Sequence, residues 1–430
     1  MPRKSKKRVK KQTPSRPGAF GRVGQILLPM IAGIAATKAD LTQWVYEQGL
    51  TSLHELLRAD AEELSGPKGK HEKERTHHHW GSTNGELSFG GRRIQVSRPR
   101  VRSKSGKEAS LPNFEAFRKE DPLPERVLNQ ILLGVSTRGY ESSLDKPAAE
   151  LKSRGASKSA ASRHLVSRTS KKLEEYLSRR LEEFELAALM MDGLEVAGQT
   201  VVVTLGITID GTKVPMGIWL GSTENAPVCT ALLQNLLERG LRIDEPILCV
   251  IDGGKGIHKA LVDVLGDLAV IQRCQVHKLR NLRSHLPKSR HAYVCQTMKD
   301  AYKNESAAKA RKRLQALVSW LERNGYDEAA GSLREGMEET LTVLKLTLPE
   351  SLRKALATTN AIENLNGTIR RVSRNVKRWK NPSMIRRWTA LGVVTAEKKF
   401  RRINGCRHMS ALVHALRSKQ KSVDSDKIVA

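Results

Sequence analysis

Apolar and polar residues follow two different periods along this chain, and the dominant period changes near residue 186. Residues 41–64 repeat apolar positions every three to four residues, which predicts an amphipathic helix. Residues 66–82 are polar and histidine-rich, and we expect a solvated loop there. Residues 89–106 alternate apolar and basic side chains, as a short β-ribbon does. The first part of the chain is therefore expected to hold a small helical module followed by a β-ribbon.

From residue 186 the pattern predicts three strands, a helix, a strand, a helix and a fifth strand. The second and third strands are joined at Asp210-Gly211, a dipeptide suited to a tight hairpin turn. This order is that of a ribonuclease H-like mixed sheet, in which the first and fourth strands are neighbours. The fold class expected is thus α/β, with a ribonuclease H-like core.

After His277 the strand signal disappears, and two long stretches show only helical periodicity. Together with the earlier patterns, this divides the chain into seven segments. They are a disordered basic arm (1–24), a small helical module with a polar loop (25–85), a β-ribbon with a helix-turn-helix-like DNA-binding region (86–180), the first part of the catalytic core (181–277), an all-helical insertion (278–357), a helix carrying Glu363 followed by basic helices (358–417), and a frayed tail (418–430).

Two helical segments around Gly155 favour a helix-turn-helix, with Ser157 as the N-cap of the second helix. That second helix would present Lys158, Arg163 and Arg168 to a DNA groove. Any basic amphipathic pair of helices has a similar pattern, so a charged, solvated helix is the alternative.

The charge balance indicates a polyanionic partner. The net charge is +30, from 75 Lys and Arg against 45 Asp and Glu, and the basic residues recur along the whole chain. Aromatic residues make up only 4%, which favours a duplex over a single strand bound by base stacking. Five irregularly spaced cysteines indicate reduced thiols, and the apolar run at 25–36 is too short to span a membrane. We therefore expect a cytoplasmic, nucleoid-associated protein with double-stranded DNA as its partner.

Three acidic residues are candidates for catalysis. Asp192 and Asp252 each end an apolar run and would lie side by side on neighbouring strands, whereas Glu363 opens a helical pattern. Carboxylates in such positions can hold two divalent cations, which activate a nucleophile and stabilise the leaving oxygen of a phosphodiester. The alternatives are Asp-Gly turns for the two aspartates, and a capping box from Asn360 to Glu363.

Several basic residues adjoin these acids in the sequence and are candidates for contacts with DNA phosphates. Their alternative is an ordinary solvated charge run. They are Lys255, Lys278, Arg280, Arg370 and Arg371.

Four motifs in order, MMDG, VIDGGKG, IQRCQVHKLRN and TTNAIENLNGTIRR, resemble the Mutator-like transposases of bacterial insertion sequences. These are DDE transposases with a ribonuclease H-like fold and a helical insertion before the glutamate. By motif, the resemblance implies that Asp192, Asp252 and Glu363 are the catalytic, metal-binding triad. Cys274 and His277 match the Cys-x-x-His signature of the family. Asn360 and Asn364 lie beside Glu363 as a supporting polar face.

The resemblance implies binding of terminal inverted repeats, nicking at the element ends, and joining of the 3′-hydroxyl to another phosphodiester. It also implies two Mg²⁺ ions, with Mn²⁺ as a substitute, and a homodimer or larger assembly on DNA. Two alternatives remain open. One is a catalytically silent DNA-binding protein derived from a transposase, and the other is a ribonuclease H-like nuclease or resolvase.

Overall fold

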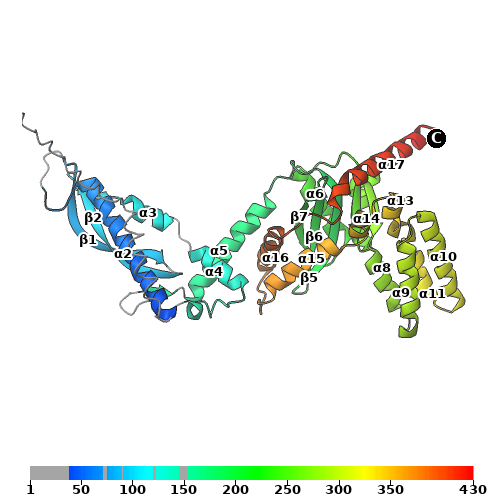
Figure 1. Cartoon of the computed structure of the whole chain (residues 1–430), viewed down its shortest axis with the longest axis horizontal. Helices are drawn as coiled ribbons and strands as arrows, with labels where there is room; N and C mark the ends of the chain where they lie inside the picture. The colour runs from blue at the N-terminus through cyan, green and yellow to red at the C-terminus, as the bar shows by residue number, and fades with distance from the viewer. Residues whose placement is uncertain are drawn as a thin grey trace, which may run out of the picture. The chain divides into compact units, whose positions relative to one another are not determined.

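The computed structural model describes residues 38–70, 75–89, 91–119, 123–144, 153–155 and 157–429. The chain divides into two compact units, residues 1–164 and 165–430 (Figure 1). The predicted basic arm and the start of the helical module fall before Lys38, outside the described residues.

The first unit is built on helix α2 (Lys38–Ser65) and a hairpin of strands β1 (His77–Phe89) and β2 (Arg92–Ser103). The predicted ribbon is present, but the prediction of a loop throughout 66–82 is wrong, because β1 begins at His77 and pairs with β2 from that residue. His79 also hydrogen-bonds to Ser65 and Gly66, at 3.0 and 3.1 Å from its Nε2. Pairing with a neighbouring strand thus overrides the polar composition. The buried side chains of this unit include Leu53, Leu57, Ala61, Leu87, Ile94, Val96, Val101, Leu111 and Phe114.

Helix α5 (Lys158–Leu177) begins where the sequence predicts. The Ser157 hydroxyl accepts a hydrogen bond from the amide of Ala160 at 3.3 Å, which confirms the N-cap. Residues 145–152, where the preceding helix is predicted, lie outside the described residues. Between the hairpin and α5 the structure has β3 (Glu108–Ala109), α3 (Pro112–Lys119), α4 (Leu123–Leu132), a 3₁₀ turn η1 (Glu141–Ser143) and β4 (Ser153–Gly155), which pairs with β2.

The second unit contains a five-stranded mixed sheet in the order β7-β6-β5-β8-β9. Its strands are β5 (Leu186–Val196), β6 (Gln199–Thr208), β7 (Lys213–Gly221), β8 (Ile247–Ile251) and β9 (Ala269–Arg273). The first three form antiparallel hairpins, and β8 and β9 add in parallel to β5. The prediction that the first and fourth strands are neighbours is confirmed. Gly211 has φ +84°, as the tight turn between β6 and β7 requires.

Helices cover both faces of this sheet. Alternate residues of β5 belong to two different apolar clusters, because successive side chains of a strand point to opposite faces. Met190 and Leu194 pack in the cluster that includes helix α15 (Asn360–Ser373) and helix α16 (Pro382–Glu397). Leu189 and Met191 pack in the cluster of the two helices on the other face, α6 (Ala226–Glu238) and α7 (Lys255–Leu265). The sheet is therefore the middle of three layers (Figure 1).

The predicted all-helical insertion is also present. Its helices are α8 (Gln275–Ser284), α9 (Lys288–Tyr302), α10 (Ala307–Arg323), α11 (Asp327–Arg334), α12 (Met337–Thr340), α13 (Thr342–Lys345) and α14 (Glu350–Leu356). Helices α8 to α11 form a bundle with a separate apolar core, which includes Leu282, Leu314 and Leu321 (Figure 1). Helix α14 packs instead in the core of the sheet, through Leu352 and Leu356.

The last helix corrects the prediction of a frayed tail. After a 3₁₀ turn η3 (Cys406–His408), helix α17 (Met409–Val429) continues well past residue 417. Leu412 and Leu416 are buried in the core, and no glycine or proline interrupts the segment that follows. Core packing therefore starts a helix that its polar sequence then continues.

All five cysteines are free, as their spacing predicts. Within the part of the chain that the structure describes, no helix has both the length and the apolar character needed to cross a bilayer.

Candidate active site

Asp192 and Asp252 lie on adjacent parallel strands. In the register of β5 and β8, Met190 is paired with Val250, and each aspartate lies two residues further along its strand direction. By the alternation of side chains, both aspartates continue the rows that face α15. Burial, followed by the charge of Asp252, raises the pKa of Asp192 to about 6. The fold thus brings together two carboxylates that repel each other.

Asn366 contacts the first aspartate, which the sequence did not predict. Its Nδ2 donates to Asp192 Oδ2 at 2.7 Å, and the residue is only 2% exposed. Asn360 and Asn364, the two asparagines predicted to support the site, are exposed on the same helix. The signal for Asn366 was its position among the apolar residues of α15, where a polar side chain needs a partner.

Glu363 belongs to the same constellation. Its Oε1 lies 3.3 Å from His277 Nε2 and 3.6 Å from Arg280 Nη1, and it accepts a hydrogen bond from the Thr359 hydroxyl at 3.4 Å. The Glu363 charge also acts on Asp192. The capping-box alternative is wrong, because the N-cap of α15 is Thr359, which places Glu363 one residue beyond the position that a capping box requires.

Cys274 and His277 support this glutamate from the start of α8. A hydrogen bond with Cys274 raises the pKa of His277, and the charges of Glu363 and Asp252 act in the same direction. Burial alone would raise the pKa of Cys274, but hydrogen bonds with His277 and Thr359 lower it overall. Thr359 links the elements, since its amide donates to Cys274 Sγ at 3.4 Å and its hydroxyl lies 3.2 Å from His277 Nδ1. These contacts favour a positively charged imidazole beside Glu363.

A fourth carboxylate, Glu224, is present, and sequence reasoning missed it. It precedes α6, whose N-cap Asn225 accepts a hydrogen bond from the amide of Val228 at 3.0 Å. Burial, followed by the charges of Asp252 and Asp192, raises the pKa of Glu224 to about 7. Glu224 is therefore close enough to both aspartates to interact with them electrostatically.

The donor chemistry of this constellation suits a hard cation. Carboxylate oxygens are the ligands that Mg²⁺ prefers, and a cation would relieve the repulsion by Asp252 that, after burial, raises the pKa of Asp192. However, no three His, Cys, Asp or Glu side chains of the described residues are arranged as the ligands of a single ion. The carboxylates would therefore have to approach one another when a cation binds.

Most of the basic residues predicted to bind DNA are on the surface. Lys158 and Arg163 are exposed on α5, and Arg168 of the same helix is half-buried. The predicted DNA-contacting residues that are exposed in the second unit are Lys255, Arg280, Arg370 and Arg371. Their contacts with DNA stay predictions.

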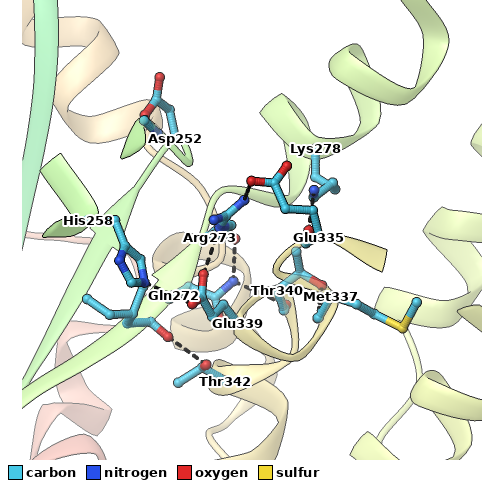
Figure 2. A network of polar contacts seen from close by, with 12 residues as sticks. Asp252, His258, Gln272, Arg273, Lys278, Glu335, Met337, Glu339, Thr340 and Thr342 are labelled. Carbon is cyan, nitrogen blue, oxygen red and sulfur yellow. Dashed lines mark hydrogen bonds and ion pairs between the residues drawn. The ribbon is translucent and has the colours of Figure 1, made fainter. Parts of the chain in front are cut away.

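Lys278 is the exception, and its assignment to DNA is corrected. It is only 4% exposed, and its Nζ donates to the carbonyl of Ser332 at 2.6 Å and to that of Glu335 (Figure 2). The ammonium group is thus used inside the protein, where it joins α8 to α11.

The same region holds the insertion against the sheet. Arg273, the last residue of β9, lies 2.7 Å from Glu339 and 3.5 Å from Glu335, as measured from Nε and Nη1 (Figure 2). Glu339 also lies 3.0 Å from His258 Nε2 on α7. Gln272 donates to the carbonyl of Thr340 at 3.1 Å. The short helix α12 is therefore tied to both β9 and α7, next to the strand that leads into Cys274.

Lys278→Met is expected to destabilise the second unit by about 1–3 kcal/mol, because the buried ammonium group of Lys278 and its two bonds to carbonyl groups, which join α8 to α11, are lost. Thermal unfolding followed by circular dichroism measures the loss. Arg283→Met, at an exposed position of the same helix, is the control and is expected to change little. Equal stability of the two variants would contradict the structural role of Lys278.

The fold and the site thus define a mixed α/β protein with a group of carboxylates near the adjacent central strands β5 and β8 of its sheet. Comparison with known families identifies the class, since the profile of the Mutator family of transposases matches residues 32–402. The chain therefore belongs to the Mutator transposase family, as its four motifs indicate.

Individual relatives agree with this assignment. The chain is 30% identical to the transposase for insertion sequence element ISRM5 of Rhizobium meliloti, over 81% of this chain and 86% of the relative. It is 28% identical to the transposase for insertion sequence element IS256 in transposon Tn4001 of Staphylococcus aureus, over 74% and 81%. It is 27% identical to the transposase for insertion sequence element IS905 of Lactococcus lactis, over 82% and 89%.

Proposed function

We propose that this protein is a DDE-type transposase of a bacterial insertion sequence, which nicks the ends of its element and joins them to new DNA. The observation that carries the proposal is the position of Asp192 on β5 and of Asp252 directly after the adjacent parallel strand β8, with Glu363 interacting electrostatically with Asp192. Membership of the Mutator family supports the same reading.

The proposal includes a ribonuclease H-like fold for the second unit. Its support is the strand order β7-β6-β5-β8-β9, with three antiparallel strands followed by two parallel ones, and helices on both faces. The helical insertion separates the second aspartate from the glutamate, as expected for this group of transposases.

Asp192, Asp252 and Glu363 would hold two Mg²⁺ ions, with Mn²⁺ as a substitute. When bound, such ions lower the pKa of an attacking water or 3′-hydroxyl and stabilise the departing oxygen of a phosphodiester. The residues of the chain prepare the site. Asn366 fixes one oxygen of Asp192 by a hydrogen bond from its Nδ2.

His277 and Arg280 orient Glu363 from α8, since both lie within 4 Å of its Oε1. These contacts hold the carboxylate of Glu363 at the start of α15. The mechanism uses no covalent bond between protein and DNA, which separates it from that of serine and tyrosine recombinases.

The partner proposed is double-stranded DNA, both as element ends and as target. A net charge of +30 supports contacts with many phosphates, and Lys158, Arg163 and Arg168 of α5 are the residues proposed to lie on the duplex. Because two element ends must meet, we propose that a homodimer or larger assembly forms on DNA in the nucleoid.

The test is a strand-transfer assay with Mg²⁺ and DNA that carries the element's own terminal repeats. Metal-dependent joined product is expected from the native protein, and Glu363→Ala is expected to remove it while DNA binding is retained. Glu397→Ala is a matched control, because this glutamate lies on another helix and pairs with Arg179 at 2.7 Å.

The assay also separates the alternatives. Cleavage of the ends with no joined product would indicate a nuclease or resolvase. Binding of the ends with neither cleavage nor joining would indicate a silent DNA-binding protein.

A further inference from the structure

Two glycines near the aspartates, Gly193 and Gly254, lack the positive φ that usually requires glycine. Gly193 follows Asp192 within strand β5, and Gly254 has φ −58° and ψ 123°, a conformation open to other residues. Only Gly253, between Asp252 and Gly254, has a positive φ, at +109°. The backbone therefore explains the glycine at 253 but leaves those at 193 and 254 unexplained.

The lack of space for a side chain accounts for both glycines. A Cβ atom at Gly193 would overlap Oε2 of Glu224, and a Cβ at Gly254 would overlap Oε1 of the same side chain. The Gly254 position is also only 3.3 Å from Asp252 Oδ1. Both oxygens of Glu224 thus occupy the room left by the missing side chains, one at the residue after Asp192 and the other two residues after Asp252.

A third glycine brings the backbone of this segment equally close. A Cβ at Gly256 would lie 2.9 Å from the carbonyl oxygen of Glu224 and from the carbonyl carbon of Asn225. Because Gly256 is in the first turn of α7, the start of that helix packs directly on the segment that carries Glu224. The close packing on Gly256 therefore fixes the backbone from which the Glu224 side chain extends.

The charges that act on Glu224 favour binding of a cation beside it. The Gly193 amide donates a hydrogen bond to it, but the nearby charges that act on it are those of Asp252 and Asp192, which are both negative. A carboxylate held against two others gains most from a shared positive ion, because a cation removes the repulsion of all three at once.

We propose that Glu224 is a third carboxylate ligand of the divalent cations held by Asp192 and Asp252. This inference rests on the proposed function, since it adds a ligand to the same metal site. It also gives the Asp-Gly and Asp-Gly-Gly-Lys-Gly motifs a further role, in which the glycines admit Glu224 to the site.

The test measures the binding of Mn²⁺ to the full-length protein without DNA by isothermal titration calorimetry. Glu224→Gln keeps the shape of the side chain but removes its charge, and we expect it to weaken Mn²⁺ binding by at least about 10-fold. Glu238→Gln, at the exposed far end of the same helix α6, is the matched control and is expected to bind as the native protein does. Gly193→Ala should weaken binding as Glu224→Gln does, because the new methyl group displaces Glu224.

The outcomes separate this inference from the proposed function. Native binding by Glu224→Gln, together with loss of binding by Asp252→Asn, would overturn the role of Glu224 and leave the metal site intact. No Mn²⁺ binding by the native protein would overturn both. Circular dichroism of each variant ensures that a loss of binding is not a loss of folding.

Discussion

Asp252→Asn and Asp192→Asn are each expected to reduce nicking and strand joining by about 1,000-fold or more. Each change replaces a charged metal ligand by a neutral amide of the same shape, and several kcal/mol of transition-state stabilisation depend on the ions. Rates of nicking and joining on end-containing DNA with Mg²⁺ measure the effect. Binding of the same DNA, followed by electrophoretic mobility shift, should be largely retained, since phosphate contacts dominate affinity.

Glu195→Gln is the control for these variants. Glu195 is exposed on β5, three residues after Asp192, so its replacement tests whether any change of charge on this strand reduces activity. Native nicking by the Asp252→Asn protein would refute the catalytic assignment. In that case Asp252 would have only its structural role, in which Oδ1 accepts a hydrogen bond from the Gly254 amide at 2.8 Å.

Arg239→Ala is expected to destabilise the second unit by about 3 kcal/mol or more. Arg239 is 7% exposed and donates to three backbone carbonyls, those of Arg179, Met216 and Tyr176, at 3.0, 2.8 and 3.2 Å. Truncation leaves these buried acceptors without a donor, at about 1–3 kcal/mol for each. Thermal unfolding should therefore occur roughly 6–12 °C lower.

Arg242→Ala is the matched control, because Arg242 is exposed three residues later and its loss is expected to change stability by less than about 0.5 kcal/mol. A melting temperature of Arg239→Ala equal to that of Arg242→Ala would contradict the structural role. The position of Arg239 also matters for the site, because Arg239 is the C-cap of α6, and Glu224 directly precedes Asn225, the N-cap of the same helix.

The two ends of α6 therefore make different contacts. At its C-terminal end, Arg239 ties the helix to β7, to the last turn of α5 and to the segment after α5. At its N-terminal end, Asn225 caps the helix beside the carboxylate cluster. A rigid attachment at one end holds the residue at the other in position, which is what a metal ligand on a loop needs.

The position of the insertion follows a similar logic. Arg273 and Gln272 anchor the short helix α12 to the end of β9, and Lys278 joins α8 to α11 (Figure 2). Cys274 and His277 lie on the segment between these anchors. The contacts of the insertion thus help to fix the side chains that orient Glu363.

By itself, the sequence determined the elements of the second unit and their order. Apolar runs with a period of two or of about 3.6 residues predict strands and helices well, because the pattern reflects which face each element buries. This is why the five strands, the adjacency of the strands that carry Asp192 and Asp252, and the helical insertion were all predicted. The four motifs likewise identified the family, since they are local and need no knowledge of contacts.

Only the tertiary structure decided which polar side chains meet. Glu224 carries no motif, and its proximity to the aspartates depends on how α6 and α7 pack across the sheet. Asn366 rather than Asn360 or Asn364 contacts Asp192, because the buried side of α15 is set by packing against the sheet. Lys278 was assigned to DNA for its charge, whereas its surroundings direct it into the insertion. Contacts between residues far apart in the sequence depend on the relative placement of whole elements, and local periodicity holds no information about that placement.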